Sequence, residues 1–174
     1  LYHLGINTMG ITLAQANEAM AEADLLYSAD DIANMLDVMA AEITAVLADK
    51  NPLVLCIMNG GVITTGHLLT RLNFPLEQDY LHATRYRGKT VGGKTLAWLR
   101  KPDANLAGRH VLLVDDILDE GYTLREIVQW CREQNAASVH VAALAEKMHD
   151  RRVDGIKCDF SALKLVDRYV FGFG

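Results

Sequence analysis

VLLVDDILDEGYTL, at residues 111–124, is the stretch that decides the fold, because a buried strand and a polar turn meet in it. Four apolar residues in a row, at 111–114, are typical of a strand that helices cover on both faces. Asp115, Asp116, Asp119 and Glu120 follow, and Gly121 comes next. Carboxylates this close repel one another, so a fold that keeps them needs cations or a ligand nearby.

The segments on either side of this stretch alternate between strand and helix patterns. Apolar runs or β-rich segments predict strands at 53–58, 80–86, 111–114 and 139–144. Helical spacing of apolar residues predicts helices at 28–50, at about 65–72, and from Leu124 onward. Ser28 and Asp31 predict a capped start for the first of these helices, and Pro52 predicts its end.

Alternating strands and helices imply right-handed crossovers and a mainly parallel sheet with helices on both faces, an α/β fold. We expect a single domain over residues 1–174, because no repeat, low-complexity segment or linker interrupts the pattern. The segment RGKTVGGK, at 87–94, has three glycines and almost nothing to bury, which predicts a mobile loop.

Composition excludes several classes of protein. The chain has 17 basic and 22 acidic residues, a net charge of −5, which argues against general binding to nucleic acid or to anionic membranes. There is no apolar run long enough to span a membrane and no export signal. The three cysteines form no CxxC pair, which favours reduced thiols in the cytoplasm and gives no zinc site.

The polar turn has the residues for a phosphate site. In open α/β sheets, ligands bind beyond the carboxyl ends of the strands, where Asn59-Gly60-Gly61 and the acidic turn both fall. Gly121 permits a tight backbone, the amides from Glu120 to Thr123 form a nest for phosphate, and Thr123 adds a hydroxyl. The alternative is that Asp115 and Asp116 are only solvated and that Asp119 caps a helix.

Two other acidic motifs fit poorly. The DDxxD motif of isoprenoid synthases lies on a helix, whereas here an apolar strand precedes the acids and Gly121 follows them. Haloacid-dehalogenase phosphatases have a DxD pair after their first strand, which this turn lacks.

The stretch resembles the phosphoribosyl pyrophosphate signature of type I phosphoribosyltransferases: apolar strand, two acids, two apolar residues, Asp, any residue, Gly, any residue, Thr. MNGG, at 58–61, is similar to the pyrophosphate loop of that family, and Arg85-Tyr86 to the start of its flexible loop. Lys147 after a strand, and VDRYVFGFG at 166–174, resemble the hypoxanthine-guanine branch. The resemblance covers most of the chain from about Ser28.

The resemblance implies roles around the ribose and its phosphate. Asp115 and Asp116 would accept hydrogen bonds from the ribose hydroxyls and place negative charge near a cationic sugar. Asp119 would exchange the proton on purine N7. The 5-phosphate cradle would be Glu120, Gly121, Tyr122 and Thr123. The family more often has Thr where Glu120 stands, so we expect this side chain to point away from the phosphate.

The resemblance also implies sites for pyrophosphate and base. Met58, Asn59, Gly60 and Gly61 would hold pyrophosphate, with a cis peptide bond between Met58 and Asn59; many relatives have Lys where Asn59 stands. Lys147 would donate to O6 of a 6-oxopurine, Tyr169 would stack on the base, and Val170 would meet its edge. Alternatively, Lys147 is simply solvated, Tyr169 and Val170 belong to the core, and a Gly-Gly pair makes an ordinary turn.

Arg85 and Tyr86 would open a lid over the site, in a family that more often has Ser-Tyr; a basic surface hairpin is the alternative. The core would span about 28–149, and residues of about 1–26 and 150–174 would form a hood over the base. Magnesium would act through Asp115 and Asp116 only indirectly, since the family's metal-contacting Asp would lie beyond Gly174. The five histidines from His67 onward show no ligand spacing and are given no role.

The resemblance therefore predicts a purine-salvage glycosyltransferase. It would transfer the 5-phosphoribosyl group of phosphoribosyl pyrophosphate (PRPP) to hypoxanthine or guanine, giving IMP or GMP, with Mg²⁺ as cofactor. A homo-oligomer, dimer or tetramer, is expected on the same basis, with no nucleic acid or membrane partner. The alternatives are a non-catalytic nucleotide-binding regulator with the same fold, and a transferase for another base.

Overall fold

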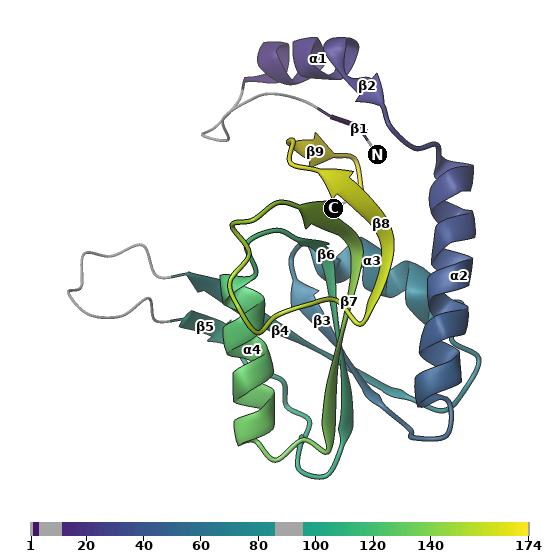
Figure 1. Cartoon of the computed structure of the whole chain (residues 1–174), viewed down its shortest axis with the longest axis vertical. Coiled ribbons are helices and arrows are strands. Elements are labelled where there is room, and N and C mark those ends of the chain that lie inside the picture. Colours follow the sequence, from purple (N-terminus) through teal and green to yellow (C-terminus); the bar gives the residue numbers. More distant parts are fainter. Residues whose placement is uncertain (1, 4–11, 86–95, 174) are drawn as a thin grey trace, which may run out of the picture.

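The computed structural model describes residues 2–3, 12–85 and 96–173 (Figure 1). The elements are β1 (Tyr2–His3), α1 (Leu13–Glu22), β2 (Asp24–Leu25), α2 (Ala29–Leu47), β3 (Leu53–Met58), α3 (Gly61–Leu69), β4 (Glu77–Arg85), β5 (Leu96–Arg100), β6 (His110–Leu118), α4 (Tyr122–Glu133), β7 (Ser138–Met148), β8 (Phe160–Val166) and β9 (Val170–Phe171). None of the described helices combines the length and the apolar character needed to cross a membrane.

The core is a six-stranded sheet in the order β5-β4-β3-β6-β7-β8. Every neighbouring pair is parallel except β4 and β5, which run antiparallel. This arrangement confirms the predicted α/β class with a mainly parallel sheet. Because β3 and β6 are neighbours in the middle of the sheet, their carboxyl ends lie side by side.

Helices cover both faces of this sheet, with α2 and α3 on one side and α4 on the other (Figure 1). Alternate residues of each strand point to opposite faces. Val54 of β3 therefore belongs to the buried cluster of α2, whereas Leu53 and Leu55 belong to that of α4. Burial on both sides explains why β3 and the first half of β6 read as unbroken apolar runs.

The start of α2 has the capping box predicted from the sequence. The backbone amide of Asp31 donates to Ser28 Oγ at 3.1 Å, and the Ser28 amide donates to Asp31 Oδ2 at 2.9 Å. Along the helix, Leu36, Ile43 and Leu47 are completely buried against the sheet. The apolar spacing thus reported the buried face correctly.

A second, three-stranded antiparallel sheet lies above the carboxyl ends of the core strands, in the order β2-β1-β9 (Figure 1). Both ends of the chain contribute to it. Of the 150–174 segment that was expected to form a hood, β9 belongs to this small sheet, whereas β8 pairs with β7 in the core sheet. This strand has no unbroken apolar run; only Phe160, Leu163 and Leu165 of it are buried.

Other predicted boundaries need correction. Helix α3 begins at Gly61 rather than near residue 65, and β4 begins at Glu77 rather than at residue 80. β5 was not predicted; among the described strands it pairs with β4 alone, and none of its side chains is fully buried. β6 and β7 continue past their apolar runs, to Leu118 and Met148. Parallel pairing between them persists there, since Asp115 pairs with Ala143 and Leu118 with Glu146.

Candidate active site

A cavity of about 320 Å³ opens beyond the carboxyl ends of β3 and β6. Residues from β3, β4, β6 and the start of α4 form its walls. Most of the acids, glycines and hydroxyls expected to bind a phosphorylated ribose are among them. Its lining is Ile57, Met58, Gly60, Ala83, Asp115, Asp116, Ile117, Leu118, Asp119, Glu120, Gly121, Tyr122, Thr123 and Leu124.

The turn after β3 is packed tightly against β6, which requires its two glycines. A Cβ atom at Gly60 would lie 2.5 Å from Asp116 Oδ2, and one at Gly61 would overlap the carbonyl oxygen of Val114. The peptide bond between Met58 and Asn59 is cis, which confirms the expectation from the resemblance. The backbone of this turn and the Asp116 carboxylate therefore share one corner of the cavity.

The sequence suggested that Asp115 and Asp116 lie in a turn after the strand, but the structure places both on β6 itself. The Asp116 amide donates to Asp115 Oδ1 at 2.9 Å, and the Ile117 amide donates to Asp116 Oδ1 at 2.7 Å. Burial raises the pKa of Asp115 well above its usual value, and the charge of Asp116 raises it further. Two carboxyl groups with this degree of repulsion form a site that favours a cationic or hydroxyl-rich ligand.

The start of α4 closes the cavity on its other side. Gly121 is the N-cap residue and has a left-handed conformation with φ of 79°, which glycine adopts without steric cost. Its carbonyl accepts from the Arg125 amide at 2.9 Å, and the Glu120 carbonyl accepts from the Val153 amide at 2.9 Å. These contacts hold the first turn of α4 with its N-terminal end at the cavity, where a helix favours an anion.

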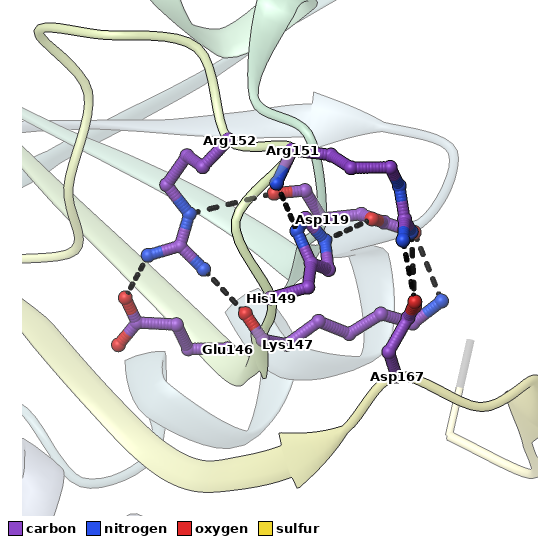
Figure 2. A network of polar contacts seen from close by, with 7 residues as sticks. All are labelled: Asp119, Glu146, Lys147, His149, Arg151, Arg152 and Asp167. Atoms are coloured by element: carbon purple, nitrogen blue, oxygen red, sulfur yellow. Dashed lines mark hydrogen bonds and ion pairs between the residues drawn. The ribbon is translucent and has the colours of Figure 1, made fainter.

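Asp119 receives two side-chain hydrogen bonds (Figure 2). Lys147 Nζ donates to its Oδ2 at 2.9 Å, and His149 Nε2 lies 2.7 Å from its Oδ1. Burial by itself raises the pKa of Asp119, but the hydrogen bonds from Lys147 and His149 outweigh burial and hold that pKa below its usual value. The resting group is therefore a carboxylate that can accept a proton.

Two arginines extend this network (Figure 2). The Arg152 guanidinium donates to the backbone carbonyls of Asp119 and Lys147 and pairs with Glu146. Arg151 pairs with both oxygens of Asp167, at 2.6 and 3.0 Å. The turn after β7 is thereby tied to the end of β6.

Asp119, His149 and Asp167 offer ligand atoms within 4.8 Å of one another, a spacing that could hold a metal ion. The carboxylate oxygens of Asp119, however, already accept from Lys147 and His149, and those of Asp167 accept from Arg151. With two permanent cations in place, the cluster has charge balance without a metal. We do not regard it as a metal centre.

Several predicted residues lie beside the cavity rather than in its wall. Lys147 reaches it through Asp119, and Asn59 is exposed on the turn after β3. Val170 lines a smaller adjoining cavity of about 60 Å³, together with Asp116 and Ile117. The ring of Tyr169 is stacked 6.4 Å from that of Phe171.

The two lid residues are only partly covered by the structure. Arg85 is the last residue of β4, and Tyr86 lies outside the described residues, so their expected role stays a prediction.

Sequence reasoning missed His149, which had been given no role. Its contact with Asp119 joins the end of β7 to the end of β6, and it depends on the register between these strands, which cannot be read from the sequence. One available signal was the spacing of Lys147 and His149, since residues two apart in an extended segment point to the same side.

Comparison with known proteins identifies the family. The family model named phosphoribosyl transferase domain matches residues 22–174. The hypoxanthine-guanine-xanthine phosphoribosyltransferase of Tritrichomonas foetus is 34% identical over 151 residues, covering 86% of this chain and 81% of that protein. The hypoxanthine-guanine phosphoribosyltransferase of Streptococcus thermophilus is 31% identical over 158 residues, covering 89% and 87%. The chain belongs to the phosphoribosyltransferase family.

Solved structures agree. A hypoxanthine-guanine-xanthine phosphoribosyltransferase superposes with a TM-score of 0.75 at 30% identity, covering 87% of this chain and 84% of its own. A hypoxanthine phosphoribosyltransferase from Staphylococcus aureus reaches 0.80 at 24% identity, covering 87% and 82%, and shows the same fold. The fold is that of the type I phosphoribosyltransferases, as the resemblance implied.

Proposed function

We propose that this protein is a purine-salvage enzyme that transfers the 5-phosphoribosyl group of PRPP to hypoxanthine or guanine, giving IMP or GMP and pyrophosphate. The observation that carries the proposal is the cavity between β3, β6 and α4. It joins paired carboxyl groups, a glycine turn and a helix N-terminus, and it adjoins the hydrogen-bonded pair of Asp119 and Lys147. The names of the relatives support the same activity.

In this proposal each wall of the cavity takes one part of PRPP. Amides at the start of α4 and the Thr123 hydroxyl hold the 5-phosphate, and the turn at Asn59–Gly61 holds pyrophosphate through its backbone. Asp115 and Asp116 accept the ribose hydroxyls. Their negative charge also stabilises the positive charge that develops on the sugar as pyrophosphate leaves.

The base binds beside Asp119 and Lys147. N9 of the purine forms a bond to C1′ of the ribose, the C1′–O bond breaks with its electron pair going to pyrophosphate, and the N7 proton passes to Asp119. Lys147 donates to O6, which selects a 6-oxopurine over adenine, because the 6-amino group of adenine is itself a donor. Tyr169 stacks on the base and Val170 meets its edge.

The residues present fit a magnesium–pyrophosphate substrate. Asp115 and Asp116 are adjacent carboxyl groups with a raised Asp115 pKa, and Asp116 lies directly against Gly60 of the proposed pyrophosphate turn. A hard cation with oxygen ligands, Mg²⁺, suits such a corner. When bound, it would neutralise charge on the leaving pyrophosphate. The two aspartates would act on it indirectly, through the ribose hydroxyls.

The test is product formation from PRPP and Mg²⁺ with hypoxanthine, guanine, xanthine and adenine in parallel. We expect turnover of 6-oxopurines and none of adenine. Turnover of adenine alone would assign the chain to another base. Binding of nucleotide without turnover of any base would instead favour a regulatory protein with this fold.

The remaining expectations belong to the same proposal. A cytoplasmic location is supported by the three cysteines, which are all free thiols. We propose one domain, with the three-stranded sheet and α1 as its hood, and a dimer or tetramer in solution, without nucleic acid or membrane partners. Sedimentation velocity measures the oligomer directly.

A further inference from the structure

His149 is held at a fixed place in the site by contacts at both ring nitrogens. Only 5% of its side chain is exposed. Nε2 lies 2.7 Å from Asp119 Oδ1, and Nδ1 accepts from the Arg151 backbone amide at 3.2 Å. One tautomer satisfies both contacts: the proton is on Nε2, which donates to Asp119, and Nδ1 is the acceptor.

The two oxygens of Asp119 therefore have different partners. Oδ1 is bound by His149, a nearly buried ring fixed by backbone, and Oδ2 is bound by Lys147, a flexible side chain with three donors. In the proposed reaction Lys147 also has to donate to the purine O6. When it turns toward the base, His149 is the contact that keeps the Asp119 carboxylate in place.

We propose that His149 is the positioning residue of the acid–base apparatus: it anchors Oδ1 of Asp119 and leaves Oδ2 as the oxygen that exchanges the N7 proton. This inference rests on the proposed function. No proton leaves His149 in the step; the ring donates the same hydrogen bond before and after Asp119 is protonated. A carboxylate that is held in this way meets its proton partner without a search over rotamers.

Charged groups from several elements surround this contact. They are Asp115 and Asp116 on β6, Glu120 after it, Glu146 and Lys147 on β7, Arg151 and Arg152 after β7, and Asp167 after β8. The hydrogen bond from His149 is one of the causes that lower the Asp119 pKa. Removing it leaves the other groups unchanged, so the pKa of Asp119 should rise.

The experiment compares His149→Ala and His149→Gln with the wild-type protein in single-turnover assays from pH 3 to 9, a range that includes the lowered pKa of Asp119. The glutamine amide can restore a donor near the position of Nε2. The matched control is His110→Ala, because His110 is also a part-buried histidine in one hydrogen bond, to Ser138 at 2.8 Å, far from the site. In parallel, ¹³C NMR follows the titration of the Asp119 carboxyl, which is assigned with Asp119→Asn.

We expect His149→Ala to lower the single-turnover rate by about ten-fold, with KM for PRPP changed less than about two-fold. The acid limb of its pH profile and the Asp119 titration should both move to higher pH. His149→Gln should recover most of the rate, and His110→Ala should behave as wild type. This rescue and the pH shift are not expected from a purely structural role.

The proposal is overturned if His149→Ala keeps the wild-type rate and the wild-type Asp119 titration, or if His149→Gln is no better than His149→Ala. If His149→Ala does not fold, His149→Phe, which keeps a ring at this place but has no hydrogen-bond donor, takes its place in both comparisons. A wild-type protein without turnover of any base would overturn the proposed function instead, and the NMR titration would still show whether His149 holds Asp119.

Discussion

At the scale of single residues, the site depends on how each carboxyl group is partnered. Asp115 has a raised pKa through burial and the charge of Asp116, whereas Asp119, four residues further on, has a lowered pKa because Lys147 and His149 donate to it. Acids only a few residues apart thus suit the different tasks that we propose for them: Asp115 and Asp116 contact the ribose hydroxyls and a positively charged sugar, and Asp119 accepts a proton.

Replacing the acid–base group tests this division. Asp119→Asn keeps the shape of the side chain and loses the ability to take a proton, so we expect the single-turnover rate to fall by about ten-fold or more. Asp150→Asn is the matched control, because it makes the same change of charge at an exposed position in the turn after β7. Equal rates for the two variants would exclude Asp119 as the acid–base group.

Glu120 offers a second test at this scale. Its charge lies near Arg151, whose pKa it helps to raise, so its repulsion of a phosphate should be largely compensated. We expect Glu120→Thr to change KM for PRPP by less than about two-fold at both low and high ionic strength. If the Glu120 charge repelled the phosphate, the effect of the substitution would be larger at low salt than at high salt. A KM that falls several-fold at low salt only would show that the side chain faces the phosphate.

At the scale of elements, the connection from β6 to α4 presents the proposed phosphate cradle. The strand carries the acids past its apolar run to Leu118, and Gly121 then reverses the chain into the helix with a positive φ. Ile156, from the segment before β8, packs on the same glycine. The turn is therefore shaped by a long-range contact as well as by its own sequence.

Gly121→Ala should separate these two causes. A left-handed conformation costs a non-glycine residue about 1–2 kcal/mol, and a Cβ at Gly121 would also lie 2.6 Å from Ile156 Cγ2. Gly108→Ala is the control, since Gly108 has a φ of 72° but its Cβ would meet nothing within 4 Å. We expect urea denaturation to show a loss of about 1 kcal/mol at Gly108 and a clearly larger one at Gly121. Equal losses would mean that Ile156 adapts freely.

At the scale of the whole molecule, the site is built where two sheets meet and where segments distant in the chain converge. The core sheet supplies the acids and Lys147, and the small sheet that both ends of the chain form brings Val170 to the adjoining cavity. The acids also make the stability of the fold depend on pH in two opposite ways, because the pKa of Asp115 is raised while those of Asp79 and Asp119 are lowered.

The sign of that dependence can be worked out for each group. Groups with lowered pKa values, such as Asp79, contribute stability that is present above the unfolded value of about 3.9 and is lost as pH falls below it. Asp115 acts in the opposite sense. Its folded form binds its proton more tightly than the unfolded chain does, so stability falls as pH rises from about 3.9 toward its folded pKa.

Asp115→Asn should remove this second effect. Without Mg²⁺ or PRPP, in EDTA, we expect the variant to melt about 2–4 °C above the wild type at pH 7, the shift that about 1 kcal/mol produces in a chain of this size, and to match it near pH 3.5. The Asp116 amide keeps its acceptor, because the amide oxygen of Asn replaces Oδ1. A variant that melts at or below the wild-type temperature at pH 7 would contradict a raised Asp115 pKa. Activity should be lost in either case.

Local pattern was enough to determine the elements whose signal is repeated along the chain. The apolar runs of β3 and β6, the buried face and capping box of α2, and Gly121 after the acids all depend on neighbours within a few residues. A strand that is buried on both faces has a continuous apolar run, and an amphipathic helix repeats its apolar residues every turn. The resemblance of 111–124 to a known signature then supplied the family.

Only the tertiary structure decided which side chains meet. Edge strands such as β5 and β8 are only partly buried, so their places in the sheet follow from pairing with β4 and β7. The contact of His149 with Asp119 spans 30 residues and depends on the register of β6 against β7, in which a shift of one residue would turn the side chains to the other face. Sequence by itself thus determined the acids, the glycines and the class of fold, and the register of the sheet determined their partners.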